Sequence, residues 1–327
     1  MAASRQVISI VGSSTVYPFA KAVTEKFAEK TAMRMPELKS TGSGGGLKLF
    51  CAGAGPENPD ISNASRSIKK AEYDQCTDNG VKKIVEVKIG YDGIVIANSR
   101  RAPLLKLTTR DIFLALAQDV PDDGQKALIP NPYKYWNEVN PVLPPLRIKV
   151  YGPPPTSGTR DAFEELAMEK GCSSFAWIKD LKKRHKKRFR DICHAVREDG
   201  GYIDSGENDN LIVDKLEADP HAMGIFGYSY LDQDHDKIQG SHVDSYAPTF
   251  KNISSGAYPL SRPLYFYVKK ARVGAVPGLT QYLEEFTADT TWGPNGYLVH
   301  IGLIPMSKQD RQKYRDIARK LIVMKRW

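Results

Sequence analysis

β-rich runs alternate with helical segments along most of this 327-residue chain, and this alternation limits the fold more than any other feature. The run Val7–Val11 is followed by a segment in which Phe19, Val23 and Phe27 recur at a helical spacing. Such alternation predicts an α/β protein with open, mainly parallel sheets. Ligands of such sheets bind at helix starts, beyond the carboxyl ends of the strands.

One turn between a strand and a helix carries a strong set of anion donors. The expected strand Leu146–Tyr151 leads through three prolines to Ser157, Gly158, Thr159 and Arg160. The first N–H groups of a helix lack intrahelical acceptors and lie at the positive end of its dipole, so they can bind an anion. Arg160 adds a permanent charge with forked donors. Ser-Gly-Thr also makes an ordinary helix cap, so the turn alone does not establish a site.

The turn after the first strand has a similar character. Ser13, Ser14 and Thr15 directly precede the first expected helix. Capping a helix needs only one hydroxyl group, whereas this turn offers three. It is therefore a second candidate for binding an anion.

A Gly-rich loop, Thr41–Gly46, is expected between a strand at Glu37–Ser40 and a short helix at Leu47–Ala52. It is not a nucleotide P-loop, because that motif ends in Gly-Lys-Ser/Thr and Gly46 is followed by Leu and Lys. Glycines let a ligand approach the backbone closely, and Ser43 offers N–H and O–H donors. A flexible loop without a ligand is the alternative.

Opposite charges bracket the next expected strand. Asp60 precedes it and Arg66 follows it, with the strand ending at Ala64 or Ser65. A surface ion pair is the usual outcome for such neighbours. The functional alternative is that both side chains face a pocket shared with the hydroxyl-rich turns.

Two β-rich crossings, near residues 89–93 and 258–265, divide the chain into two lobes. They predict lobe I from residues 1–91 and 260–327, lobe II from residues 92–259, and a two-strand hinge between them. The ligand cleft would lie between the lobes and close by a hinge motion. Within lobe II, residues 119–145 are expected to form a surface excursion that three aromatic residues anchor: Tyr133, Tyr135 and Trp136.

Most of the net charge of +9 comes from residues 182–190, which contain seven Lys or Arg. A solvated helix face is the first interpretation of this run, because no aromatic stacking platform accompanies it as nucleic-acid binding would require. Docking to an acidic partner or a membrane surface is a further alternative. No apolar run is long enough to span a membrane, and no cleavable leader is visible.

The four cysteines form neither a C-x-x-C pair nor a zinc spacing with histidine. Each half of the sequence has its own pair, which allows two loop-closing disulfides, Cys51–Cys76 and Cys172–Cys193, and favours an oxidising compartment. Four separate buried thiols are the alternative. The six histidines form no metal-binding pair and no recognisable triad with the helix-start serines.

Seven motifs follow one another along the chain: Gly12–Pro18, Thr41–Gly46, Asp60–Arg66, Pro155–Asp161, Gly206–Asn210, Gly224–Ser229 and Ser261–Tyr267. Together they resemble the PstS family, the phosphate-binding proteins of bacterial Pst transporters. The similarity spans essentially the whole chain, and the ordered set is more specific than any one motif.

The resemblance implies a two-lobed periplasmic binding protein with a type II-like α/β fold. Such a protein binds inorganic phosphate with high affinity and delivers it to the permease subunits of an ABC transporter in the inner membrane. It is not an enzyme and needs no cofactor beyond its phosphate ligand. We further expect a monomer without a nucleic-acid partner, located in the periplasm, whose leader is absent from the sequence at hand.

The family's phosphate contacts can be carried over residue by residue. They would be Ser14, Thr15, Ser43, Asp60, Ser157, Gly158 and Thr159. Some members have an Arg four positions before the Ser of Ser-Gly-Thr, where this chain has Pro153. The positive charge must then come from Arg160, Arg66 or both, and we expect both to contact phosphate.

Asp60 would also explain how phosphate is distinguished from sulfate. Phosphate keeps a proton near neutral pH that a carboxylate can accept, whereas sulfate has none. An unmade pairing costs several kcal/mol, or about a thousandfold in affinity. Arsenate keeps a proton and would be rejected poorly. The alternatives are a binding protein for another tetrahedral oxyanion, such as sulfate or molybdate, and, with less support, a phosphatase-type hydrolase.

Overall fold

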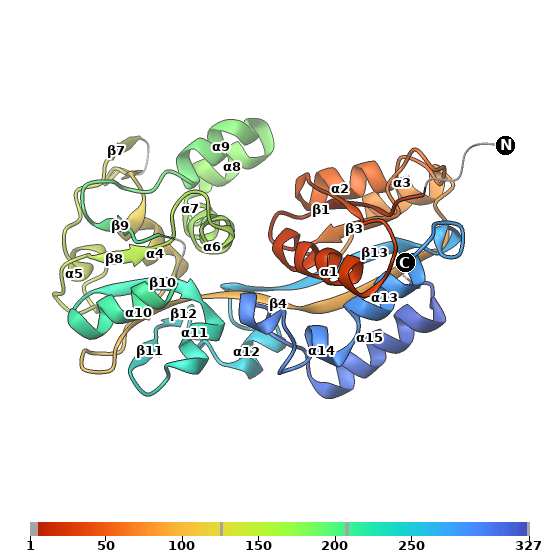
Figure 1. Cartoon of the computed structure of the whole chain (residues 1–327). Coiled ribbons are helices and arrows are strands. Elements are labelled where there is room, and N and C mark those ends of the chain that lie inside the picture. Colours follow the sequence, from red (N-terminus) through yellow and green to blue (C-terminus); the bar gives the residue numbers. More distant parts are fainter. Residues whose placement is uncertain (1–5, 125–126, 207–208, 326–327) are drawn as a thin grey trace. The chain divides into compact units, whose positions relative to one another are not determined.

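The computed structural model describes residues 6–124, 127–206 and 209–325. The chain forms two compact units, unit 1 from residues 1–92 and 262–327 and unit 2 from residues 93–261 (Figure 1). These boundaries lie close to those expected from the sequence. The chain leaves unit 1 within the long strand β4 (Ile84–Ser99) and returns at the start of β13 (Ser261–Lys269).

Unit 1 is a sheet with helices on both faces, which confirms the predicted α/β class. The sheet has the order β2-β1-β3-β13-β4, in which β1 runs parallel to β2 and β3 while β13 runs antiparallel to β3. Besides β4 and β13, the elements are β1 (Ser9–Gly12), α1 (Tyr17–Lys30), β2 (Glu37–Ser40), α2 (Gly42–Phe50), β3 (Ile61–Ala64), α3 (Lys70–Asp78), η2 (Lys270–Arg272), α13 (Leu279–Phe286), α14 (Asp289–Trp292), η3 (Val299–Ile301) and α15 (Lys308–Lys320).

The strand order of unit 1 reverses at β1. The chain runs from β1 through α1 to β2 on one side, and from β2 through α2 to β3 on the other side of β1. Right-handed crossovers of this kind place α1 and α2 on opposite faces of the sheet. Figure 1 agrees, because α1 lies with α13 and α2 lies with α3. The carboxyl end of β1 is thus a topological switch point, where ligands of such sheets bind.

Apolar side chains on both faces hold unit 1 together. Phe19, Val23 and Phe27, at the predicted helical spacing, are buried on α1, and the ring of Phe27 meets Tyr282 edge to face at 5.9 Å. On the other face, the first disulfide considered from the sequence, Cys51–Cys76, joins the end of α2 to α3 within an apolar cluster.

Unit 2 has a second sheet with the order β4-β10-β8-β9. Strands β9 and β10 run parallel to β8, whereas β10 and β11 run antiparallel to β4, so the sheets of both units are mixed rather than mainly parallel. The elements of unit 2 are β5 (Lys106–Leu107), α4 (Thr109–Leu116), β6 (Asp119–Pro121), β7 (Leu128–Pro130), α5 (Trp136–Val139), β8 (Val150–Gly152), α6 (Gly158–Phe163), the π-helical η1 (Glu164–Met168), α7 (Glu169–Cys172), α8 (Ala176–Arg184), α9 (Lys186–Cys193), β9 (Tyr202–Asp204), α10 (Asp209–Ala218), β10 (Met223–Gly227), α11 (Tyr228–Gln233), β11 (Ile238–Gly240), β12 (His242–Val243) and α12 (Phe250–Ser254).

The strand order of unit 2 reverses at β8, as it does at β1 in unit 1. The chain passes from β8 to β9 on one side and then from β9 through α10 to β10 on the other side. After β8, the elements α6, η1 and α7 follow one another without a gap and form one helical segment. The second expected disulfide, Cys172–Cys193, joins the end of α7 to the end of α9.

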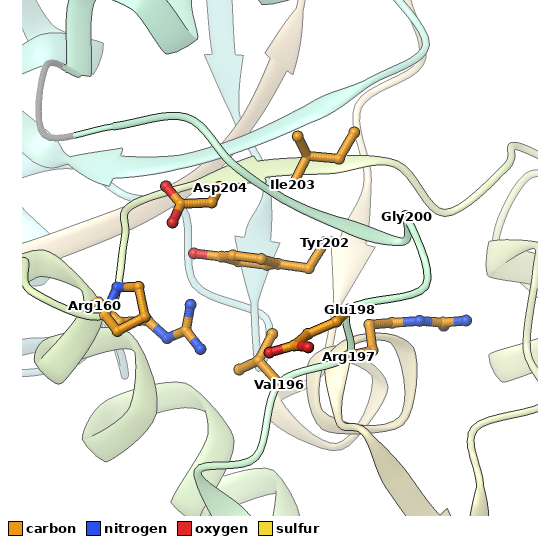
Figure 2. A pocket seen from close by; sticks show the side chains of 9 residues that line it. Arg160, Val196, Arg197, Glu198, Gly200, Tyr202, Ile203 and Asp204 are labelled. Carbon is orange, nitrogen blue, oxygen red and sulfur yellow. The ribbon is translucent and has the colours of Figure 1, made fainter.

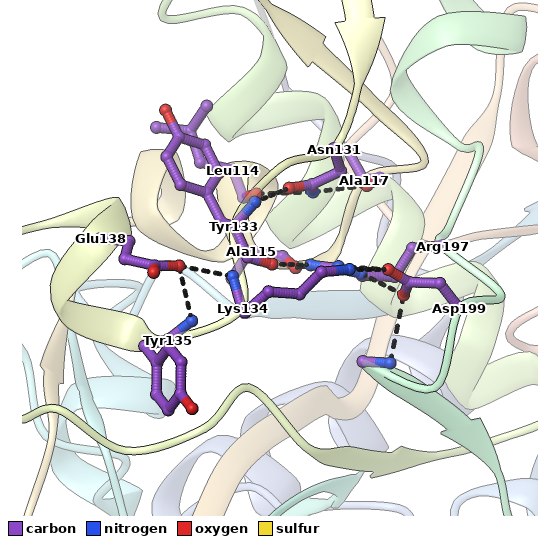
Figure 3. Close-up of polar contacts among 11 residues, drawn as sticks. Leu114, Ala115, Ala117, Asn131, Tyr133, Lys134, Tyr135, Glu138, Arg197 and Asp199 are labelled. Atoms are coloured by element: carbon purple, nitrogen blue, oxygen red, sulfur yellow. Dashed lines mark hydrogen bonds and ion pairs between the residues drawn. The ribbon is translucent and has the colours of Figure 1, made fainter.

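The surface excursion of unit 2 is fastened mainly by polar contacts (Figure 3). Arg197 is 3% exposed and donates to the carbonyl groups of Ala115 and Tyr133, both at 2.9 Å. Of the three expected aromatic anchors, Trp136 is buried, but the prediction for Tyr135 is wrong because its side chain is 42% exposed. Tyr135 is held through its backbone, because its N–H donates to the carboxylate of Glu138. This hydrogen bond leaves the ring free to face solvent.

Candidate functional site

Both switch-point strands end at turns that the sequence singles out as anion donors. Strand β1 ends at Gly12, directly before Ser13–Thr15, and β8 ends at Gly152, five residues before Ser157. The fold therefore places each predicted turn at the carboxyl edge of the sheet in its own unit, where helix starts expose unpaired N–H groups.

Close backbone packing brings the loops of unit 1 together. Gly12 has a φ of +131°, and a Cβ atom there would overlap the backbone of Asn63 at the end of β3. Ser13 N donates to the carbonyl of Asn63 at 3.0 Å, and Thr41 N donates to that of Gly12 at 2.8 Å. Only glycine fits this contact, so the loops that follow β1, β2 and β3 meet at one edge.

The Gly-rich stretch is helical rather than a loop. It forms the first turns of α2, which pack closely against the end of β1. A Cβ atom on Gly46 would overlap the Cα atom of Gly12, so only glycine allows this contact. The expected loop is thus corrected to a helix start that lies against the end of β1. The hydroxyl of Ser43 accepts from Ser65 N at 3.0 Å and lies 3.1 Å from Ser65 Oγ, which ties this helix to the end of β3.

A cation missed by the sequence reasoning, Arg262, lies beside the first turn. Its Nη2 donates to Thr15 Oγ1 at 2.7 Å and its Nε donates to Asp92 at 3.0 Å, and the side chain is only 9% exposed. The register of β13 explains the position, because Tyr265 pairs with Ala64 and Arg262 extends beyond the end of β3. The only sequence signal was that Arg262 falls in a motif typical of the PstS resemblance.

Arg66 lies at the same edge, but its charge is already paired. Its guanidinium binds both carboxylate oxygens of Glu72, at 2.6 and 2.9 Å, and the hydrogen bond to Glu72 raises the pKa of Arg66. Although burial opposes the change, the contacts with Arg66 and the N–H of Lys69 lower the pKa of Glu72. Arg66 is therefore close to the start of α2 while serving an ion pair.

Asp60 is not brought together with the other predicted residues. It precedes β3, so it stands at the amino edge of the parallel strands, opposite the turns. Its buried carboxylate accepts from Ser9 N at 2.9 Å and from Arg272 Nε at 2.9 Å. The structure contradicts the expectation that Asp60 reads the proton of phosphate, because the carboxylate is committed to a structural ion pair.

In unit 2, the Ser157 turn has the predicted local form. Ser157 caps α6 and its Oγ accepts from Thr159 N at 3.2 Å. Gly158 is exposed and a Cβ atom there would meet nothing within 4 Å, so the helix start is open on that side. This leaves room for an anion above the first turn.

The guanidinium of Arg160 folds back over the strand end. It lies 4.8 Å from the centre of the Tyr202 ring, and its Nε donates to Glu164 at 2.7 Å. Figure 2 shows both side chains lining a pocket of about 430 Å³, to which Asp204 and Glu198 also belong. Ser157, Gly158 and Thr159 are not among the residues lining that pocket. Two residues of the Gly206–Asn210 motif, 207 and 208, lie outside the described residues.

Among the described residues, no helix is both long and apolar enough to cross a membrane. Nor does that part of the chain contain a group of three or more His, Cys, Asp or Glu able to hold a metal ion.

The chain is similar in sequence to several named proteins. It is 29% identical over 282 residues to protein SphX of Synechococcus elongatus, covering 83% of this chain and 72% of SphX. It is also 29% identical over 278 residues to the phosphate-binding protein PstS of Staphylococcus saprophyticus, covering 84% of this chain and 73% of that protein.

Among solved structures, a possible phosphate binding protein from Planctomyces limnophilus has the same fold, with a TM-score of 0.75 and 24% identity over 97% of this chain and 99% of that one. The family model described as the PBP superfamily domain matches residues 2–290. With this match over most of its length, the chain belongs to the PBP superfamily.

Proposed function

We propose that this chain binds inorganic phosphate with high affinity. The observation that carries the proposal is the group of donors at one edge of unit 1, where the hydroxyl-rich turn and the start of α2 meet and the buried Arg262 binds Thr15. Helix starts with a buried cation favour a small, multiply charged oxyanion over a neutral ligand. The similarity to a protein named for phosphate binding supports phosphate as that oxyanion.

The proposed phosphate-binding residues differ from the sequence-based set. In unit 1 they are Ser14, Thr15, Ser43 and Arg66, with Arg262 added and Asp60 removed. In unit 2 they are Ser157, Gly158, Thr159 and Arg160. That one phosphate is bound by both units stays a prediction, which requires one phosphate per chain and a loss of affinity from variants in either unit.

We also propose that the loaded protein delivers phosphate to the permease of an ABC transporter and works in the periplasm or an equivalent oxidising compartment. The two disulfides support such a compartment, because disulfides are rare where thiols are kept reduced. If the basic run at residues 182–190 docks to the permease, reversing its charge should stop transport and leave phosphate affinity intact.

Calorimetric titration with phosphate, sulfate and arsenate at two pH values tests the proposed function. We expect one tightly bound phosphate per chain and tighter binding of phosphate than of sulfate. No phosphate binding, or sulfate binding of equal strength, would contradict the proposal. The titration with sulfate is informative because Asp60, the one residue expected to reject sulfate, lies at the other edge of the sheet. Any preference for phosphate must then come from other residues.

Single variants then test two of the three proposed cations, Arg262 and Arg160. Replacing Arg262 or Arg160 with Ala should weaken phosphate binding by about tenfold to a hundredfold, the range for a hydrogen bond to a charged group. Ser157→Ala should cost less, because a neutral donor contributes less. The exposed Arg188, changed to Ala, is the matched control. Equal losses for Arg160→Ala and Ser157→Ala would show that Arg160 contributes no charge to the ligand.

A further inference from the structure

Alternating charges form a chain that leads away from Arg160 in unit 2. Arg160 Nε lies 2.7 Å from Glu164 Oε1, and the other oxygen of Glu164 lies 3.1 Å from His194 Nδ1. His194 Nε2 lies 2.9 Å from Glu169 Oε1. The other oxygen of Glu169 lies 2.6 Å from Lys182 Nζ. Each carboxylate therefore stands between two nitrogen atoms.

The position of His194 between two carboxylates requires a proton on both ring nitrogens. A neutral imidazole has one N–H and one lone pair, so one carboxylate would face a lone pair. Burial alone would lower the pKa of His194, but hydrogen bonds to Glu164 and Glu169 raise it to about 9. His194 also caps the carboxyl end of α9, where a positive charge is favoured.

The charged groups around His194 come from the helices packed against it. Glu164 lies on η1 and Glu169 on α7, and they are the groups that face its ring. Arg160 of α6 and Lys182 of α8 lie on the far sides of these carboxylates. The disulfide Cys172–Cys193 joins α7 to α9 one residue before His194, so the ring is held beside its partners by a covalent link.

We propose that His194 is a positioning residue for phosphate binding, which acts on Arg160 through Glu164. The inference rests on the proposed function, because Arg160 is one of its phosphate-binding cations. While His194 is charged, the carboxylate of Glu164 is shared between two cations, and Arg160 keeps positive charge for the ligand. When His194 loses its proton, Glu164 is left to Arg160 alone and offsets its charge.

The π-helical turn fits this role. Residues Glu164–Met168 interrupt the α-helical segment that begins at Gly158, and such turns occur frequently at functional sites. Glu164, the first residue of this turn, lies between Arg160 of α6 and His194 at the end of α9. The turn at Ser157–Arg160 and the end of α9 are thus linked through the carboxylate of Glu164.

The test compares phosphate affinity in four proteins, with His or Gln at position 194 and Glu or Gln at position 164. At pH 7, His194→Gln should weaken binding by about five- to tenfold when Glu164 is present, and by less than about twofold in the Glu164→Gln background. His194→Lys, which keeps a charge, should restore the affinity. Between pH 8 and 10 the wild-type affinity should fall and that of His194→Lys should not, since the second ionisation of phosphate is nearly complete by about pH 8.

His221→Gln is the matched control, because His221 is an exposed histidine of the same unit. Equal losses from His194→Gln in both backgrounds would overturn the inference, since they would mean a general effect on folding. A readout independent of the ligand is the NMR titration of the His194 ring, expected near pH 9 and lowered in Glu164→Gln. An ordinary ring titration would overturn the inference even if phosphate binds, whereas failure of the wild type to bind phosphate would contradict the proposed function instead.

Discussion

Two ion pairs in unit 1, each joining a buried arginine to an aspartate, have different consequences for the protein. Asp60 and Arg272 join the amino edge of the sheet to η2, away from the anion-binding turns. Asp92 and Arg262 stand beside Thr15 at the other edge. Removing one partner of a buried pair leaves a charge without compensation, which costs far more than the pair itself contributes. The two pairs should therefore be separable by experiment.

Asp60→Asn should destabilise the protein without changing its ligand preference. We expect the free energy of unfolding in urea to fall by about 3 kcal/mol, because Arg272 loses its carboxylate in a buried position. Phosphate and sulfate affinities should stay as in the wild type. Asp92→Asn is the comparison, since it frees a charge on Arg262 and should alter phosphate affinity. An Asp60→Asn variant that keeps the wild-type stability and binds sulfate more tightly than the wild type would show that Asp60 belongs to the binding site.

At the scale of elements, the approach of α2 to β1 decides where the donors of unit 1 stand. Gly46 lies so close to Gly12 that the helix cannot carry a side chain there. Gly45, its neighbour, points elsewhere, and a Cβ atom there would meet Thr41 Cβ at an ordinary 3.5 Å. Two adjacent glycines of one helix thus differ in what they tolerate, and this gives a matched pair of variants.

Gly46→Ala should move α2 away from β1, lower the free energy of unfolding by about 1–3 kcal/mol and weaken phosphate binding. Gly45→Ala should be neutral or stabilise the protein by up to about 1 kcal/mol, because alanine favours a helix. Urea unfolding and calorimetry of the two variants measure both effects. If Gly45→Ala weakened phosphate binding as much as Gly46→Ala, the affinity would depend on close approach of the ligand to the helix backbone rather than on the packing of α2 against β1.

The disulfides hold separate pairs of helices, and their loss should act locally. Cys172–Cys193 closes a loop with a sequence separation of 21, so replacing both residues with Ser should cost about 3 kcal/mol of unfolding free energy. Replacing Cys51 and Cys76 should cost a similar amount, since their separation is 25. Only the first change should shift the NMR titration of His194. A shift in both variants would contradict this local view.

At the scale of the whole molecule, the charge chain of unit 2 should give stability a defined dependence on pH. Burial opposes ionisation of Glu169, but His194 and Lys182 lower its pKa to about 2. A carboxylate with a lowered pKa stabilises the fold above its ordinary pKa of 4.5, and this contribution is lost as the pH falls through about 2. His194 has a raised pKa, so its contribution is complete below 6.5 and is lost as the pH rises through about 9.

Stability should therefore be highest between about pH 4.5 and 6.5 as far as this chain of charges is concerned. Urea unfolding of the wild type and of His194→Gln from pH 4 to 10 measures the effect. The difference between the two proteins should shrink as the pH rises from about 6.5 to about 9, because the folded wild type keeps the ring proton that the unfolded chain has already lost, and it should vanish above 9. A difference that stays constant over that range would contradict the assignment of the charge to His194.

The sequence by itself determined the local parts of this protein. Periodic apolar residues predicted α1, and hydroxyl-rich turns after expected strands predicted the helix starts that follow them, α1 after Ser13–Thr15 and α6 after Ser157, because such signals depend on neighbours along the chain. The paired cysteines left two interpretations, and both disulfides are formed. The direction of β3 could also have shown that Asp60, which precedes it, belongs to the edge away from the ligand.

Only the tertiary structure decided which distant residues join these turns. Arg262 reaches Thr15 across 247 residues because β13 pairs with β3 in one register. His194 reaches Glu164 because a disulfide and helix packing bring α9 beside η1. The Gly-rich stretch became a helix because contact with Gly12 outweighs the low helix propensity of glycine. Pairing, register and packing act between segments far apart in the chain, and no local pattern records them.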